Sequence, residues 1–298
     1  MSQSRESSRG LAYGLGAYGL WGFFPLYWKL LHPSGALEIL AHRIVWSVLV
    51  LGILVLLTHR QGQLRGILRD RRKTALLVIA ATFVSINWGT YIYGVNHDRI
   101  VETALGYFIN PLVTVGLGVV VLGERLRPLQ WVSMGLALVA VLVLTFDYGH
   151  PPWIALTLAF SFGLYALVKK RASVQAIESL TFETSLVAPL AIGFLVYLAA
   201  TGRSTFGAFG VDHALFMAGT GIATAVPLLL FGAAAIRLPL TVIGPLQYLA
   251  PIIQFSIGLV IFHEPMTHVR WIGFILVWMA LVIFTVEAVS HYRRVRVG

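Results

Sequence analysis

Arg43 is the residue with the clearest chemical potential, because it lies inside an apolar run that extends over residues 36–58. At about 1.5 Å per residue, its place in a helix is roughly 10 Å from the helix start. Arginine at the centre of a membrane helix costs roughly 2.5–3.5 kcal/mol, and less near its ends, so Arg43 should face protein and have a partner. Glu102 is the predicted ion-pair partner, because its apolar run begins at the same level, and Glu38 is the alternative. Arg43 then either binds a substrate carboxylate or phosphate, or acts as a gate, or forms a structural ion pair.

His42 is the second titratable residue in this apolar run. It could relay protons near neutral pH, or it could form a hydrogen bond within the bundle. The remaining His, Asp and Glu residues show no recognisable metal-ligand spacing, so no metal site is predicted. The sequence has no cysteine, which excludes thiolate metal sites and thiol nucleophiles. It also has no G-x-x-x-x-G-K-[ST] motif, so neither ATP nor another cofactor is predicted.

A larger set of polar and aromatic residues lies inside other apolar runs. Its members are Asn87, Trp88, Tyr91, Tyr107, Asn110, Tyr165, Gln247 and Tyr248. Polar side chains in apolar runs should face other protein or a wet cavity. Together they predict an aromatic lining with few charges, which suits an amphipathic or aromatic small molecule better than an inorganic ion. Interhelical hydrogen bonds and interfacial aromatic belts are the alternative interpretation.

Composition identifies the environment in which these residues work. The chain of 298 residues is 58% hydrophobic and only 11% charged, whereas soluble domains carry about 25% charged residues. Most of the chain therefore cannot face water, and the sequence predicts an all-α integral membrane protein. The net charge of +10 resides largely in short loops between apolar runs. That distribution is typical of cytoplasmic loops rather than of nucleic-acid binding, so no nucleic-acid partner is predicted.

Ten apolar runs are long enough for transmembrane helices, each of which needs about 20 residues. They cover residues 10–29, 36–58, 74–94, 101–122, 128–146, 153–169, 180–200, 212–235, 241–262 and 268–288. Most Lys and Arg residues fall in the loops on one side of this arrangement. This bias predicts that both termini are cytoplasmic.

The sequence also contains an internal repeat with an offset of 140 residues. The matching pairs are Pro111 and Pro251, Gly118 and Gly258, Glu124 and Glu264, and Trp131 and Trp271. We therefore expect two repeats, residues 1–148 and 149–298, of five helices each. Because five is odd, the second repeat must have inverted topology, a pattern typical of secondary transporters. The paired prolines predict helix kinks, and each paired glutamate is expected to cap the helix that follows it.

Several motifs together resemble the RarD-type permeases of the drug/metabolite transporter superfamily, which have two EamA domains. They are EILAHR at 38–43, Asn87-Trp88, LGYFINPL at 105–112, Gly123-Glu124-Arg125, Phe160-Ser161-Phe162 and Gln247-Tyr248. The resemblance implies ten helices, a bacterial inner-membrane location and export of a small molecule, amphenicol-type or amino-acid-like. A membrane-embedded enzyme or an accessory scaffold is the alternative, although no paired catalytic set is evident. The sequence predicts no oligomeric state.

Overall fold

Helices make up the fold of the described part of the chain. The computed structural model describes residues 2–122, 126–235, 237–238 and 246–297. The elements are α1 (Ser2–Gly22), α2 (Phe24–Leu30), α3 (Ala36–Leu57), α4 (Gln61–Arg69), α5 (Arg71–Asn96), α6 (Ile100–Leu122), α7 (Pro128–Tyr148), α8 (Trp153–Ala172), α9 (Ala176–Ala200), α10 (Val211–Ala235), α12 (Leu249–Ser256), the π-helical η1 (Ile257–Ile261) and α13 (His268–Val297). These residues include no strand.

Seven of the described helices are long and apolar enough to cross a membrane, judged by length and composition. They are α3, α5, α6, α7, α9, α10 and α13. Two shorter apolar helices, in α8 and in α12 with η1, accompany them. Large apolar side chains such as Phe146 and Val120 are more than four-fifths exposed, at 84% and 83%. Exposed apolar area on this scale requires an apolar surrounding, so the chain is a multi-pass membrane protein.

Two of the predicted spans have a different form in the structure. The span predicted at 10–29 is divided, because α1 ends at Gly22 and α2 begins at Phe24 with Pro25 in its first turn. The span predicted at 241–262 includes α12 and η1, and residues 241–245 lie outside the described residues. Pro251 lies in the first turn of α12, where a missing N–H leaves no hydrogen bond broken. Pro251 thus lies near the start of a described helix, whereas Pro111 lies in the interior of α6, and the two kinks stay predictions.

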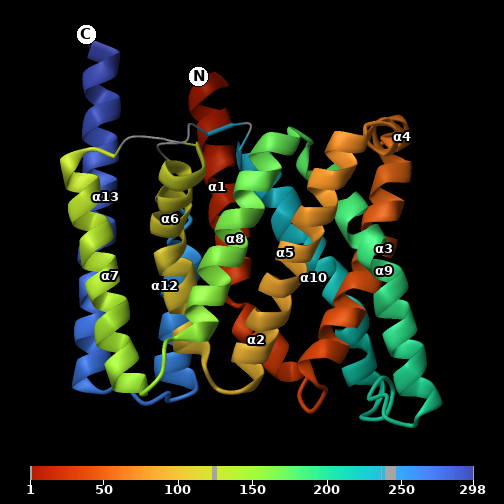
Figure 1. Cartoon of the computed structure of the whole chain (residues 1–298). Helices are drawn as coiled ribbons and strands as arrows, with labels where there is room; N and C mark the ends of the chain where they lie inside the picture. The colour runs from red at the N-terminus through yellow and green to blue at the C-terminus, as the bar shows by residue number, and fades with distance from the viewer. Residues whose placement is uncertain (1, 123–125, 236, 239–245, 298) are drawn as a thin grey trace.

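The helices pack around a closed circuit (Figure 1). In order, α6 packs against α8, α8 against α5, α5 against α3, α3 against α10, α10 against α1, α1 against α12, and α12 returns to α6. α9 packs on α3 and α5, and α7 and α13 form a pair beside α6. α1 begins and α13 ends at the same end of the bundle (Figure 1). The opposite end, here called the distal end, contains residues 31–35, 97–99 and 262–267.

Small residues set the closest approaches between helices. At Gly221 of α10, an added Cβ would lie 2.4 Å from the carbonyl oxygen of Trp46 in α3. At Gly106 of α6, it would lie 2.8 Å from the carbonyl oxygen of Ala155 in α8. Helices in lipid associate through such close backbone packing, because lipid offers no hydrophobic drive for their association. These contacts hold α3, α6, α8 and α10 in the positions that build the site.

Candidate functional site

The guanidinium of Arg43 lies at the centre of a buried group of side chains from several helices. Arg43 is only 4% exposed. Its Nε donates a hydrogen bond of 3.0 Å to the Thr224 hydroxyl oxygen on α10. Its Cζ lies 3.8 Å from the ring centroid of Trp88 on α5 and 5.2 Å from that of Trp28 on α2. Two indole faces and one hydroxyl therefore surround the charge, and cation–π attraction of this kind stabilises a desolvated arginine.

Arg43 does not pair with a carboxylate within the described part of the chain, so the predicted Arg43–Glu102 ion pair is wrong. One Glu102 oxygen accepts the backbone N–H of Ile154 at 3.1 Å, and the other lies 3.6 Å from Nη1 of Arg99. The alternative partner, Glu38, accepts the backbone N–H of Thr205 at 2.7 Å and the Thr205 hydroxyl at 2.8 Å. Glu102 thus binds the start of α8, and Glu38 binds the loop between α9 and α10.

Two tyrosines and an asparagine continue the group on the α5–α6 side. The rings of Tyr91 and Tyr107 meet edge to face with centroids 5.7 Å apart, and both lie within electrostatic range of Arg43. The Tyr107 hydroxyl donates to the Asn87 side-chain oxygen at 3.3 Å. The Asn87 amide nitrogen in turn donates to the Leu158 carbonyl oxygen and to the Ser161 hydroxyl on α8. We call Arg43, Trp28, Asn87, Trp88, Tyr91, Tyr107 and Thr224 the arginine cluster.

The structure places Arg43, Asn87, Trp88, Tyr91 and Tyr107 together, but the other predicted lining residues lie elsewhere. The half-buried Asn110 accepts a hydrogen bond of 3.4 Å from Thr114 on its own helix. The half-buried Gln247 lies just before α12, beside Tyr248. Tyr165 donates to Glu183 on α9 at 3.1 Å. Each of these three residues thus has its nearest polar neighbours outside the arginine cluster.

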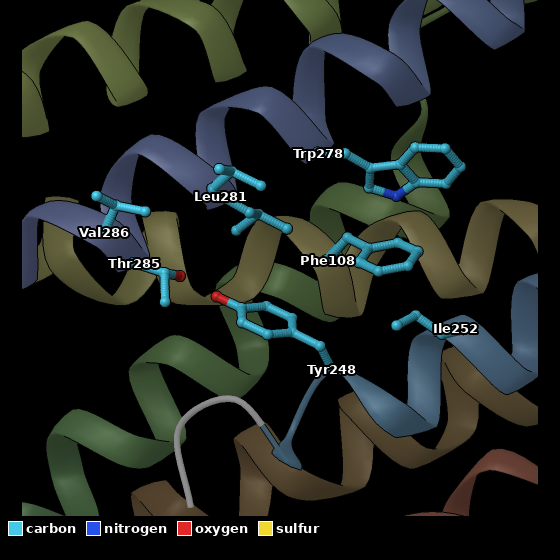
Figure 2. A pocket seen from close by; sticks show the side chains of 8 residues that line it. Phe108, Tyr248, Ile252, Trp278, Leu281, Thr285 and Val286 are labelled. Atoms are coloured by element: carbon cyan, nitrogen blue, oxygen red, sulfur yellow. The ribbon is translucent and has the colours of Figure 1, made fainter. Parts of the chain in front are cut away.

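Tyr248 lines a separate apolar groove between α6, α12 and α13 (Figure 2). The groove has a volume of about 410 Å³. Its lining consists of Phe108, Tyr248, Ile252, Trp278, Leu281, Val282, Thr285 and Val286. The Tyr248 hydroxyl points toward Thr285, while Ile252 is 51% exposed on the rim. Because it has almost no polar lining and an open rim, this groove matches a surface that contacts lipid.

A buried ion pair joins α8 to α9 around Tyr165. Lys169 Nζ lies 2.9 Å from a Glu183 oxygen, and the Glu183 side chain has no exposed surface. The Ser179 hydroxyl donates to the same carboxylate at 2.6 Å, and Lys169 also donates to Ser179. The carboxylate is thus fully partnered, which is the arrangement that a buried charge needs.

Within the described residues, no hydrogen bond joins His42 to a polar partner that would serve a proton relay. Its ring stacks on Phe206 with centroids 4.8 Å apart. Its Nε2 is buried and has no hydrogen-bond partner within the described residues. A relay requires a chain of donors and acceptors, so proton transfer through His42 stays a prediction without a visible path.

Glu264 caps a helix other than the one that we predicted. Its two oxygens accept the backbone N–H groups of Ile100 at 2.5 Å and Val101 at 2.8 Å, at the start of α6. The expectation that it caps the following helix, α13, is therefore wrong. Burial raises the pKa of the Glu264 carboxyl to about 7, and the nearby Asp98 adds to this, although the two backbone donors and Lys29 act in the opposite direction. Its repeat mate Glu124 lies outside the described residues.

The sequence did not single out Trp28 or Thr224, although both contact the guanidinium. Trp28 follows Pro25 within one predicted span, which the structure divides into α1 and α2, and its ring lies beside Arg43 of α3. Thr224 is an isolated hydroxyl in an apolar run, which usually bonds to its own helix backbone. It does so here as well, donating to the Thr220 carbonyl oxygen at 2.9 Å. A search for hydroxyls in apolar runs would have found Thr224, but no sequence signal identifies its neighbour.

Comparisons with known proteins agree with this architecture. Residues 8–146 match the EamA-like transporter family. A solved crystal structure that is 18% identical has a TM-score of 0.60 and covers 95% of this chain and 98% of its own, which supports the fold alone. Protein RarD of Streptomyces exfoliatus is 54% identical over 99% of this chain and 94% of its own. An uncharacterized transporter of Bacillus subtilis, YojE, is 43% identical over 98% of both chains. The chain therefore belongs to the RarD-type permeases of the drug/metabolite transporter superfamily, which are EamA-like membrane transporters.

Proposed function

We propose that this chain is a secondary transporter that exports a small amphipathic metabolite or drug by alternating access. The observation that carries the proposal is the arginine cluster, which is polar, aromatic and enclosed by α2, α3, α5, α6 and α10. Transporter substrate sites lie near mid-membrane between repeats, and they combine apolar walls with a few polar groups. The cluster has this composition, and among the described residues no group of three His, Asp or Glu side chains could hold a metal ion.

The same proposal includes ten membrane helices in two inverted repeats, residues 1–148 and 149–298. Packing between the helices supports it. In this scheme α3 pairs with α9, α6 with α12 and η1, and α7 with α13, and each of these helices packs against its own mate. The mate of α1 is α8, and the mate of α10 is α5. Accordingly, α1 packs on α10, and α8 packs on α5. A two-fold axis in the membrane plane would produce this pattern.

We further propose that the distal end faces outward and that the chain lies in the bacterial inner membrane with both termini in the cytoplasm. Two observations support this orientation. Both ends of the chain lie at one end of the bundle. The α4 helix, whose surrounding segment 60–73 is rich in basic residues, lies at that end too. Cytoplasmic loops carry this excess in membrane proteins generally.

A flux assay in proteoliposomes tests the transport function. The purified protein should accelerate efflux of a radiolabelled amphenicol, aromatic amino acid or aromatic carboxylate above that of empty vesicles, measured with and without a pH gradient. Trp88→Leu should reduce the flux, because it removes an aromatic wall of the cluster. Tyr248→Phe is the control, because its hydroxyl lies in the groove of Figure 2 and should leave the flux unchanged. Equal efflux from protein-containing and empty vesicles for every solute would refute the proposal.

A further inference from the structure

Arg43 carries a buried charge that nothing in the described part of the chain neutralises. Four carboxylates near the starts of α3 and α6 are occupied elsewhere: Glu38 by Thr205, Asp98 by Lys29, Glu102 by Ile154, and Glu264 by Ile100 and Val101. Among the described residues, the ionisable groups that act on Arg43 are the hydroxyls of Tyr27, Tyr91 and Tyr107, all neutral near pH 7. A charged group this deeply buried normally has a counter-charge.

The contacts that hold Arg43 leave its two terminal nitrogens unused. Nε donates to Thr224, whereas Nη1 and Nη2 have no hydrogen-bond acceptor among the described residues. The indoles of Trp28 and Trp88 cover the guanidinium but supply no acceptor. An arginine with two free Nη groups presents the parallel donor pair that a carboxylate accepts in bidentate fashion.

Further donors around the guanidinium also have no partner. The Tyr91 hydroxyl and the indole Nε1 of Trp28 are buried and make no hydrogen bond within the described residues. Leaving such groups unpaired is unfavourable, because each has lost its hydrogen bonds to water and gained none in the protein. A group of unpaired donors around one cation is the arrangement that an anion would satisfy, because an anion accepts hydrogen bonds and supplies the missing charge.

We propose that Arg43 binds the carboxylate of a singly charged organic acid with an apolar or aromatic body. This inference rests on the transport function proposed above and names its substrate class. The charge count favours a monoanion, because no second Lys or Arg in the described residues lies within electrostatic range of Arg43. A phosphate dianion would leave one negative charge uncompensated. An amino acid would bring an ammonium group for which the cluster holds no carboxylate. The rings of Trp28, Trp88 and Tyr91 provide the walls for the apolar body.

Ligand-dependent thermal stabilisation tests this inference without any measurement of transport, since a ligand that binds the folded form raises its apparent stability. The probes share one skeleton: 3-phenylpropionate, its neutral amide 3-phenylpropionamide, and phenylalanine, with phenyl phosphate as the dianion. Only 3-phenylpropionate should raise the unfolding temperature of the full-length protein in detergent, and it should quench the tryptophan fluorescence. Equal stabilisation by the amide, or stronger stabilisation by phenyl phosphate or phenylalanine, overturns the inference.

Variants assign the effect to the cluster. Tyr91→Phe keeps the ring and removes only the unpaired hydroxyl, and we expect it to weaken 3-phenylpropionate binding several-fold. Arg43→Lys keeps the charge but removes the paired donors, and should weaken binding at least about tenfold, as expected for a lost charge-assisted hydrogen bond. Tyr248→Phe should bind as the wild type does. If Arg43→Lys does not fold, Tyr91→Phe decides, and unchanged binding in Tyr91→Phe overturns the site.

The two proposals fail in different ways. If the wild type transports a neutral solute but 3-phenylpropionate neither stabilises it nor competes with that flux, the anion site is overturned while the transport function stands. If 3-phenylpropionate stabilises the wild type but not Arg43→Lys, while no solute is transported, the anion site stands and the transport function is overturned.

Discussion

Replacing Glu264 should change how the stability of the protein depends on pH. This carboxylate is 8% exposed and ties residues 262–267 to the start of α6 through the N–H groups of Ile100 and Val101. Burial, with a contribution from Asp98, raises its pKa from the usual 4.5 to about 7. In the unfolded chain the pKa returns to its ordinary value. The folded state therefore holds a proton over a range in which the unfolded state has lost it.

The sign and size of the change in stability with pH follow from proton linkage. Below pH 4.5 the carboxyl is protonated in both the folded and the unfolded state, so it does not make stability depend on pH. From 4.5 to about 7 the unfolded state releases its proton first, so stability falls as the pH rises. Each unit of pKa difference corresponds to about 1.36 kcal/mol. The full loss above pH 7 is therefore at most about 3–4 kcal/mol.

The measurement is the unfolding temperature in a mild detergent at a fixed heating rate, from about pH 5 to about pH 8. Glu264→Gln has nothing to ionise at this position, so the wild type should lose stability relative to it as the pH rises. Asp98→Asn removes the neighbouring negative charge and should shift the wild-type transition to lower pH. A difference between the wild type and Glu264→Gln that stays constant over this range would refute the reasoning. So would a wild type that gains stability as the pH rises, because the two backbone donors would then outweigh burial.

Two further substitutions test the packing between helices. Gly221→Ala should destabilise the fold by about 1–3 kcal/mol, because its Cβ would lie 2.4 Å from the Trp46 carbonyl oxygen. Gly232 is the control, because it lies in the same helix and has open space around it. Gly232→Ala should be neutral or slightly stabilising in the same thermal assay. Lys169→Met should cost roughly 3 kcal/mol because it leaves the fully buried Glu183 carboxylate without its cation. The double variant Lys169→Met with Glu183→Gln should recover most of that loss, because it removes the unpaired charge. If the double variant is as unstable as Lys169→Met alone, the unpaired charge is not the cause of the loss.

Much of the fold could be predicted from the sequence, because apolar runs and charge depletion are direct consequences of a lipid surrounding. The predicted runs at 36–58 and 128–146 match α3 and α7 within two residues at each end. The amphipathic α4 was missed, because it is short and polar and does not enter the apolar pattern. The apolar pattern predicted one span at 10–29 and not its division into α1 and α2, because an apolar run has the same hydropathy whether it forms one helix or two.

The partners in the site were harder to predict than its members. The burial of Arg43 follows from its position in an apolar run, but its pairing with Glu102 was inferred from depth alone. Depth does not determine the direction in which each helix presents its side chains. Glu102 instead faces the start of α8, where the unpaired N–H of Ile154 competes for a carboxylate as a cation would. For the same reason Tyr165, at a plausible depth, faces Glu183 on α9 rather than Arg43.

Two carboxylates at the distal end connect the halves of the chain in opposite directions. Glu102, from the first half, accepts the N–H of Ile154 in the second half, and Glu264, from the second half, accepts the N–H groups of Ile100 and Val101 in the first. If alternating access opens this end by separating these two contacts, both carboxylates become hydrated. The pKa of Glu264 would then fall from about 7 toward 4.5, so opening would release a proton at neutral pH. In that mechanism, opening of the distal end would become more favourable as the pH on that side rises, whether or not the substrate itself carries a proton.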